Sequence, residues 1–189
     1  CHLTADGQVV LFHDDDLSRV ALAVGARIAA AHGCALHVCS ASTRPPAHRG
    51  TWVSPLDAGS SAHLLDEVGS HGPCVVVVDD LGGLLEGLEN GLGGVAASHL
   101  FGRFVSTSRA DRVVLVVAAP ASHRAPGGLA GAFSRRMVRI HSAEDSLRLG
   151  MGTGARRTSP PGRFVTLDAE GGVTVVQTPL AGNTGWTPA

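Results

Sequence analysis

Residues 74–80 place the strongest constraint on the fold of this chain. Their sequence, Cys-Val-Val-Val-Val-Asp-Asp, contains four consecutive valines and is apolar on both faces of an extended strand. This pattern is typical of a central parallel strand that helices cover on each side. Asp79 and Asp80 follow at the carboxyl end of the strand, the edge at which open α/β sheets bind ligands. The alternative interpretation is a buried strand followed by an aspartate that caps a helix over 81–89.

Further apolar runs predict that this strand belongs to a larger sheet. The chain opens with a strand, a helix and a second strand, which form a right-handed βαβ unit. Near the other end, two strands flank a turn at 168–172 and predict a closing hairpin. We therefore expect a three-layer α/β fold with a mostly parallel sheet and a C-terminal β-hairpin. Residues 75–78 should form its most buried strand, flanked by 113–117 and 9–11.

The boundaries of the expected elements follow from apolar periodicity and from turn residues. Gly33 is expected to close the first helix, Ser60 or Ser61 to cap the second, and a run of glycines to break the third. The other expected strands cover residues 8–12, 35–39, 52–53, 112–118, 137–140, 163–167 and 173–177, and the expected helices cover 17–31, 60–69, 81–109, 129–133 and 144–149.

The length of 189 residues suffices for one domain with a full core. We assign residues 1–180 to this domain and 181–189 to a flexible tail, because the tail has no periodicity. The chain opens with Cys1 instead of Met, so we expect it to be a piece of a longer protein. The net charge of −1 gives no indication of direct nucleic-acid binding. The four cysteines lack metal-site spacing and are expected to be free thiols in a reducing compartment.

One compositional fact excludes whole classes of mechanism. All 15 basic residues are arginine, and the chain contains neither lysine nor tyrosine. A mechanism that needs a lysine or a tyrosine from this chain is therefore excluded. The ten histidines are scattered without the spacing of metal ligands, so no metal site is predicted from them.

The order of these parts resembles that of FtsK/SpoIIIE-type P-loop motor domains, in particular the later, degenerate domains of type VII secretion coupling ATPases. The resemblance implies a P-loop NTPase-like fold and gives Asp79 and Asp80 the Walker B-like position. It extends over nearly the whole chain. The matching segments are the strand and helix at 8–31, the acidic strand end at 75–80, the strand at 113–118, the segment 136–149, and Pro-Gly-Arg at 161–163 with the hairpin after it.

The chain departs from that family where the P-loop should lie, at residues 13–20. These residues read His-Asp-Asp-Asp-Leu-Ser-Arg-Val, with no glycine to let the backbone wrap phosphates and no lysine to reach them. The aspartates would also occupy the helix N-terminus and repel a triphosphate. We therefore predict that ATP and Mg²⁺ binding are lost, that no catalytic residue remains, and that Asp79 and Asp80 are vestigial.

The resemblance and this departure together imply a non-catalytic pseudo-ATPase domain. Such a domain would scaffold, regulate or dock substrate in type VII protein secretion, on the cytoplasmic side of a membrane that the rest of the protein contacts. Its expected partners are other domains of the same longer chain, a secreted protein substrate, and neighbours in a ring assembly. Arg135, Arg136, Arg156 and Arg157 are the candidate interface residues, and the alternative is that they are ordinary solvated charges.

A rival interpretation makes the chain an enzyme. Asp14 and Asp16, in the pattern Asp-x-Asp-x-Ser after an apolar strand, resemble the first motif of haloacid-dehalogenase-type phosphotransferases. In that family the first aspartate is the nucleophile, the second is an acid/base and Mg²⁺ bridges them. Asp79 and Asp80 would then supply further metal ligands. Against this, the family uses a basic residue, usually lysine. This chain has no lysine, so an arginine would have to substitute, and the strand order and the closing hairpin fit that family poorly.

Overall fold

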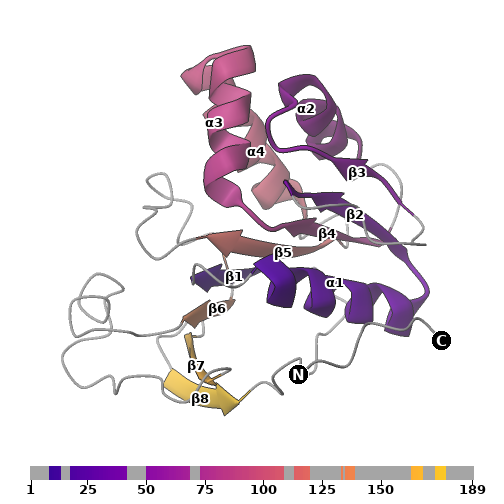
Figure 1. Cartoon of the computed structure of the whole chain (residues 1–189), viewed down its shortest axis with the longest axis vertical. Coiled ribbons are helices and arrows are strands. Elements are labelled where there is room, and N and C mark those ends of the chain that lie inside the picture. The colour runs from indigo at the N-terminus through magenta and orange to yellow at the C-terminus, as the bar shows by residue number, and fades with distance from the viewer. Residues whose placement is uncertain are drawn as a thin grey trace.

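The chain folds around a single mixed sheet in the computed structural model (Figure 1). The structure describes residues 9–13, 18–41, 50–68, 73–108, 113–119, 133, 135–138, 163–167 and 173–177. The strands are β1 (Val9–His13), β2 (Ala35–Cys39), β3 (Trp52–Val53), β4 (Cys74–Val78), β5 (Val113–Ala119), β6 (Arg135–Val138), β7 (Arg163–Leu167) and β8 (Val173–Gln177). The helices are α1 (Ser18–His32), α2 (Ala58–Glu67), α3 (Leu81–Leu92) and α4 (Gly94–Ser108).

The strand order is β3-β2-β4-β5-β1-β6-β7-β8. Strands β1 to β6 run parallel to one another, whereas β7 is antiparallel to β6 and β8 is antiparallel to β7. The predicted mostly parallel sheet with a C-terminal hairpin is therefore confirmed. The prediction that residues 9–11 flank β4 is wrong, because β2 and β5 are the neighbours of β4 and β1 pairs with β5 and β6. The apolar pattern of a strand records its burial and not the identity of its neighbours.

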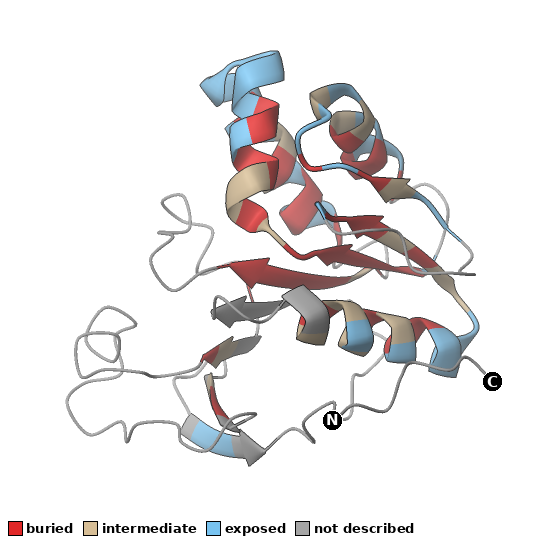
Figure 2. Ribbon diagram, viewed as in Figure 1, coloured by how far each residue is buried: buried red, intermediate tan, exposed pale blue. Residues whose placement is uncertain are grey.

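Helices cover both faces of the sheet, which makes the predicted three layers. Of the helices that the structure describes, α1 lies on one face, and α2, α3 and α4 lie on the other (Figure 1). The valines of β4 alternate between the two resulting cores: Val75 and Val77 pack on the side of α1, and Val76 and Val78 on the side of the three helices. All of β4 is buried, as the uninterrupted red of its ribbon shows in Figure 2.

Most helix boundaries lie where the turn residues predicted them. Gly33 closes α1 with a φ of 62°, a left-handed conformation that glycine adopts without a Cβ clash. Gly93 likewise separates α3 from α4 with a φ of 86°. The predicted cap at Ser60 or Ser61 is wrong: Asp57 caps α2, and its Oδ1 accepts a hydrogen bond from the backbone N–H of Ser60 at 3.0 Å. The helix therefore begins earlier than predicted.

Close packing between α3 and the start of α2 depends on glycine. A Cβ on Gly87 would lie 2.1 Å from the carbonyl oxygen of Pro55, and one on Gly91 would lie 2.3 Å from the Cβ of Ala58. On the opposite face, a Cβ on Gly25 of α1 would lie 2.2 Å from a methyl group of Val77. Gly87 and Gly91 set the distance between α3 and the start of α2, and Gly25 sets the distance between α1 and the sheet, because any side chain there would push these elements apart.

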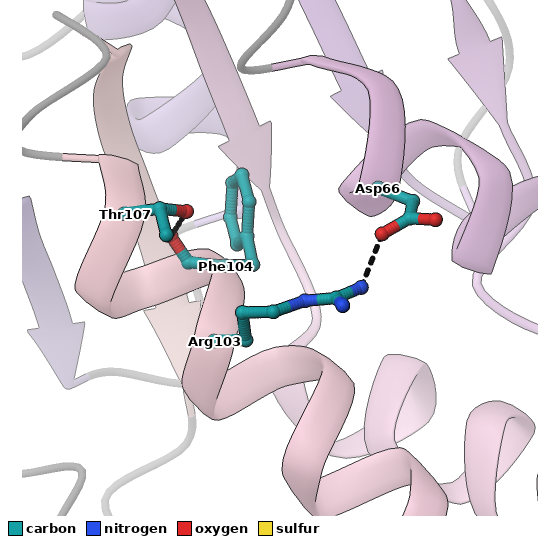
Figure 3. A network of polar contacts seen from close by, with 4 residues as sticks. All are labelled: Asp66, Arg103, Phe104 and Thr107. Carbon is teal, nitrogen blue, oxygen red and sulfur yellow. Dashed lines mark hydrogen bonds and ion pairs between the residues drawn. The ribbon is translucent and has the colours of Figure 1, made fainter.

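Helices α2 and α4 are also joined by an ion pair. Arg103 of α4 reaches across to Asp66 of α2, and both side chains are exposed (Figure 3). The same view shows Thr107, whose hydroxyl donates to the carbonyl oxygen of Phe104 at 3.3 Å within the last turn of α4.

The last third of the chain is described only in part. Strand β6 begins at Arg135, ahead of the predicted start at 137, and β7 and β8 match their predicted ranges. The predicted short helix at 144–149 lies outside the described residues, as does the helix at 129–133 apart from Phe133. The tail at 181–189 also lies outside them. None of the helices within the described ranges is long and apolar enough to cross a membrane.

Candidate functional site at the carboxyl edge of the sheet

The carboxyl ends of β1, β2, β4 and β5 meet at one edge of the sheet. The register pairs Val78 of β4 with Val117 of β5, and Ala119 of β5 with His13 of β1, so Asp79 and Asp80 follow β4 at the level where β1 also ends. The direction in which the chain moves across the sheet reverses here. From β1 the chain continues to β2 on one side of β1, whereas from β5 it continues to β6 on the other side of β1. Such a switch point is where open α/β sheets form their ligand crevice. The predicted position of Asp79 and Asp80 at this edge is confirmed.

Asp79 is held against the end of β2. Its backbone N–H donates to the carbonyl oxygen of Cys39 at 3.2 Å, which extends the pairing of β2 and β4 by one residue. Its Oδ2 accepts a hydrogen bond from the hydroxyl of Ser40. Ser40 is itself buried, and its backbone N–H donates to the carbonyl oxygen of Val53 at 3.0 Å. Asp79 is only 8% exposed, so this carboxylate is part of the packed structure.

Asp80 has a different role, because it caps the N-terminus of α3. Its backbone is extended, with φ −141° and ψ 91°, and its Oδ1 accepts from the N–H of Gly83 at 3.0 Å. A Cβ on Gly83 would lie 2.4 Å from the other carboxylate oxygen, so glycine leaves room for the cap. A carboxylate at a helix N-terminus satisfies a free N–H and interacts favourably with the helix dipole. The alternative interpretation from the sequence, an aspartate cap, is confirmed for Asp80.

Cys39 is the last residue of β2 and lies in the core next to Asp79. Its Sγ lies 3.8 Å from the hydroxyl oxygen of Ser61, which donates in turn to the carbonyl oxygen of Ser54 at 3.0 Å. Burial raises the pKa of the Cys39 thiol to about 12; the hydrogen bond with Ser61 opposes this, and the charges of Asp79 and Asp80 add to it. A thiol with so high a pKa stays protonated and is a poor nucleophile near neutral pH.

The cysteines of the described chain are free, as the sequence predicted. Cys39 and Cys74 are buried and Cys34 is half-buried. Burial also raises the pKa of the Cys74 thiol, to about 11, and the neighbouring Cys34 adds to that rise. Within the ranges that the structure describes, no group of three or more His, Cys, Asp or Glu side chains is arranged to hold a metal ion.

Of the other predicted site residues, the structure describes only Arg135 and Arg136. Asp14 and Asp16 lie outside the described residues, as do Arg156 and Arg157. Arg135 and Arg136 form the start of β6, where they pair with Val10 and Leu11 of β1. Arg136 is also opposite Leu167 of β7, so the two arginines occupy an inner strand instead of a flanking loop.

Sequence reasoning missed Ser40 as a partner of the site. The signal was present, because Ser40 follows the apolar strand 35–39 in the same way that Asp79 follows 74–78. Strand ends that share one edge are neighbours only if the strands themselves are neighbours, and the adjacency of β2 and β4 had to come from the structure.

No family model matches the sequence, and no curated protein matches it. Solved structures do match the fold. The crystal structure of B204, the DNA-packaging ATPase from Sulfolobus turreted icosahedral virus, aligns with a TM-score of 0.67 and 8% identity over 93% of this chain and 98% of its own. EssC (ATPases 2 and 3) from Geobacillus thermodenitrificans aligns with a TM-score of 0.63 and 8% identity over 91% of this chain.

The pCW3 conjugation coupling protein TcpA, solved with ATPγS, aligns with a TM-score of 0.61 and 11% identity over 91% of this chain. This chain spans 39% of the EssC structure and 60% of the TcpA structure, but nearly all of B204. At such low identities the likeness concerns the fold alone. The chain therefore shares the α/β fold of these ATPase and coupling-protein structures, which is the P-loop NTPase-like fold that its resemblance to FtsK/SpoIIIE-type motors predicted.

Proposed function

We propose that this chain is a pseudo-ATPase domain of an FtsK/SpoIIIE-like translocase. It would scaffold, regulate or dock substrate in type VII protein secretion, and it would neither bind nor hydrolyse ATP. The fold supports the translocase part of the proposal, since structures of a packaging ATPase, of EssC ATPases and of a conjugation coupling protein share it. The loss of nucleotide chemistry is argued from this chain's own residues.

The connection from β1 to α1 carries the proposal. Strand β1 ends at His13 and α1 begins at Ser18, which is where a P-loop would join the first strand to the first helix. Residues 13–20 contain no glycine and no lysine, and they include three consecutive aspartates. A backbone without glycine cannot wrap phosphates in the usual way, and the aspartates oppose their charge.

The two carboxylates that end β4 support the same conclusion. In a working motor, acidic groups at this position serve Mg²⁺ and the attacking water. Here Asp79 accepts from Ser40 inside the packed sheet, and Asp80 accepts from the N–H of Gly83 as a helix cap. Both side chains therefore have a structural role that accounts for their presence without a nucleotide.

ATP turnover by the chain and by a matched variant tests the proposal. We expect phosphate release from the purified chain with Mg²⁺ and ATP to equal that of buffer. The control is Asp79→Asn, with its fold checked by thermal melting. Turnover that persists unchanged in Asp79→Asn comes from a contaminant, whereas turnover that the unmodified chain shows and the folded Asp79→Asn variant loses would overturn the proposal.

A Mg²⁺ titration separates the phosphotransferase alternative. That interpretation requires Mg²⁺ binding through Asp14 and Asp16, and calorimetry on the chain and on Asp14→Asn/Asp16→Asn measures it directly. We expect no heat of binding from either protein. Tight binding that the double variant abolishes would favour the phosphotransferase and contradict the pseudo-ATPase.

The proposed partner contacts concern the arginines. Arg156→Glu/Arg157→Glu in the assembled translocase should impair assembly or transport while leaving the unfolding free energy of the domain within about 0.5 kcal/mol. Arg135 and Arg136 are the less clean pair, because charge reversal in an inner strand also alters strand pairing. If the Arg156→Glu/Arg157→Glu variant assembles and transports normally, these arginines are ordinary solvated charges and not interface residues.

A further inference from the structure

The two edges of the sheet differ in how they are protected. At one edge, β3 has only two residues, and a very short edge strand is one of the devices that prevent pairing with other chains. At the other edge, β8 has five residues, Val-Thr-Val-Val-Gln, with no charge and no proline. None of the usual protections of length, charge or proline is present in β8. Of the strands that the structure describes, only β7 pairs with it.

An apolar row runs across the sheet and stops at that edge. Val138 of β6 is opposite Val165 of β7, which is opposite Val175 of β8, so the three side chains share one face. Val138 is 0% exposed and Val165 is 3% exposed, but Val175 is 62% exposed. Figure 2 shows the change, with the described middle of β8 pale blue at the end of the sheet that lies farthest from α2, α3 and α4. The row is therefore buried at Val138 and Val165 and open to solvent at Val175.

We propose that β8 is a dimerisation strand, which pairs antiparallel with β8 of a second copy and joins the two sheets across a two-fold axis near Val175. The new strand would take up the outer backbone N–H and C=O groups of β8. It would also place Val175 against its own counterpart and continue the apolar row through both copies.

The sequence of β8 suits a second copy of itself. Because the strand carries no charge, pairing it with itself puts no like charges opposite each other, an arrangement that would destabilise a sheet. Antiparallel self-pairing is also isologous and closes after two copies, so it does not produce a fibre. The strand lies three positions beyond β1 in the sheet order, away from Asp79 and Asp80. Dimerisation is therefore independent of the pseudo-ATPase proposal, and either can fail without the other.

The mass of the chain in solution tests the dimer. Sedimentation across the micromolar range should show a species of twice the 19.2 kDa chain mass that dissociates on dilution. Val175→Lys should shift the mass to that of one chain, since two lysines would face each other at the axis. The matched control is Val95→Lys, the same change at a valine that is 82% exposed at the start of α4, and it should keep the dimer.

A charge-pair experiment locates the contact at β8. Val175→Lys and Val175→Glu should each be monomeric alone and should form a mixed dimer when combined, because opposite charges then face each other. Recovery of the dimer also shows that both variants are folded. Three results would overturn the proposal: a monomeric unmodified chain at all concentrations, a Val175→Lys variant that dimerises as well as the unmodified chain, or a mixture that stays monomeric.

Discussion

Two regions of the molecule are stabilised in different ways. The contact between α2 and α3 depends on the absence of side chains, whereas the carboxyl edge of the sheet depends on side-chain hydrogen bonds. Between the helices, Gly87 and Gly91 bring α3 against Pro55 and Ala58 with no room for a side chain. At the carboxyl edge, side chains make the contacts, and the hydrogen bonds of Asp79 and Asp80 bind β4 and α3 to their neighbours. The helix contact is thus maintained by tight backbone packing, while the two carboxylates at the edge make hydrogen bonds within the structure. Substitutions should therefore lower the unfolding free energy most between the helices and less at the edge. Added nucleotide should leave the stability of the chain unchanged.

Gly87→Ala should have the largest effect on stability. Its Cβ would lie 2.1 Å from the carbonyl oxygen of Pro55, a backbone atom that cannot rotate away, so α3 must move. Overpacking of this kind should lower the unfolding free energy by about 2–3 kcal/mol, measured by urea denaturation. The control is Gly102→Ala in α4, where the new methyl group would meet no atom within 4 Å beyond the adjacent residues and backbone of its own helix. That change should stabilise by up to about 1 kcal/mol through helix propensity. Equal effects of the two changes would mean that α3 and α2 are not in close contact.

Gly25→Ala should have a smaller effect on the other face. The new Cβ would meet a methyl group of Val77 at 2.2 Å, and a side chain can adjust more readily than a backbone carbonyl. We expect a loss of about 1–2 kcal/mol. Removing the opposing methyl groups in Gly25→Ala/Val77→Ala should recover part of it, and a double-mutant cycle gives the coupling. Strictly additive losses would contradict direct contact between α1 and β4.

Asp80→Ala should cost about 1 kcal/mol, the usual value of an N-cap. The N–H of Gly83 would lose its acceptor, and α3 would fray at its first turn. Asp80→Asn keeps a capping oxygen and should stay close to the unmodified chain. Chemical denaturation of the three proteins separates a cap from a charge effect, since a loss in Asp80→Asn as large as in Asp80→Ala would show that the charge matters and the cap does not.

The Asp66–Arg103 ion pair in Figure 3 should contribute least to the stability of the domain. Its side chains are about three-fifths exposed, and an exposed pair is typically worth about 0–1 kcal/mol because water and salt screen it. Asp66→Asn should therefore change the melting temperature only slightly, and high salt should remove even that difference. A loss as large as that of Asp80→Ala would contradict the assignment of this pair as solvated.

Much of the fold could be predicted because its signals are local. The valines at 75–78 mark a strand covered on both faces, and the glycine at 33 marks a helix end, whatever surrounds them. The two strands of the hairpin were likewise predicted with their observed bounds. Asp80 as a cap was one of two interpretations that the sequence left open, and the hydrogen bond from Gly83 shows the cap.

The remaining features depend on contacts between distant parts of the chain. Ser40 and Asp79 are 39 residues apart, and their hydrogen bond exists only because β2 and β4 are adjacent. The same is true of Gly87, whose lack of a side chain matters because Pro55 passes beside it. Arg135 and Arg136 extend β6 although arginine does not favour strands, since β1 pairs with both and β7 pairs with Arg136. Local pattern carries no information about such partners.

The thermal unfolding midpoint with and without Mg²⁺ and ATP tests the central claim most directly. A protein that binds a ligand only in its folded state gains about 2.7 kcal/mol at 100 times the dissociation constant, which would raise the midpoint of a domain this size by several degrees. We predict no shift for the unmodified chain at millimolar ATP. A saturable rise that requires both ATP and Mg²⁺, and that the folded Asp79→Asn variant lacks, would show a working nucleotide site and contradict the account.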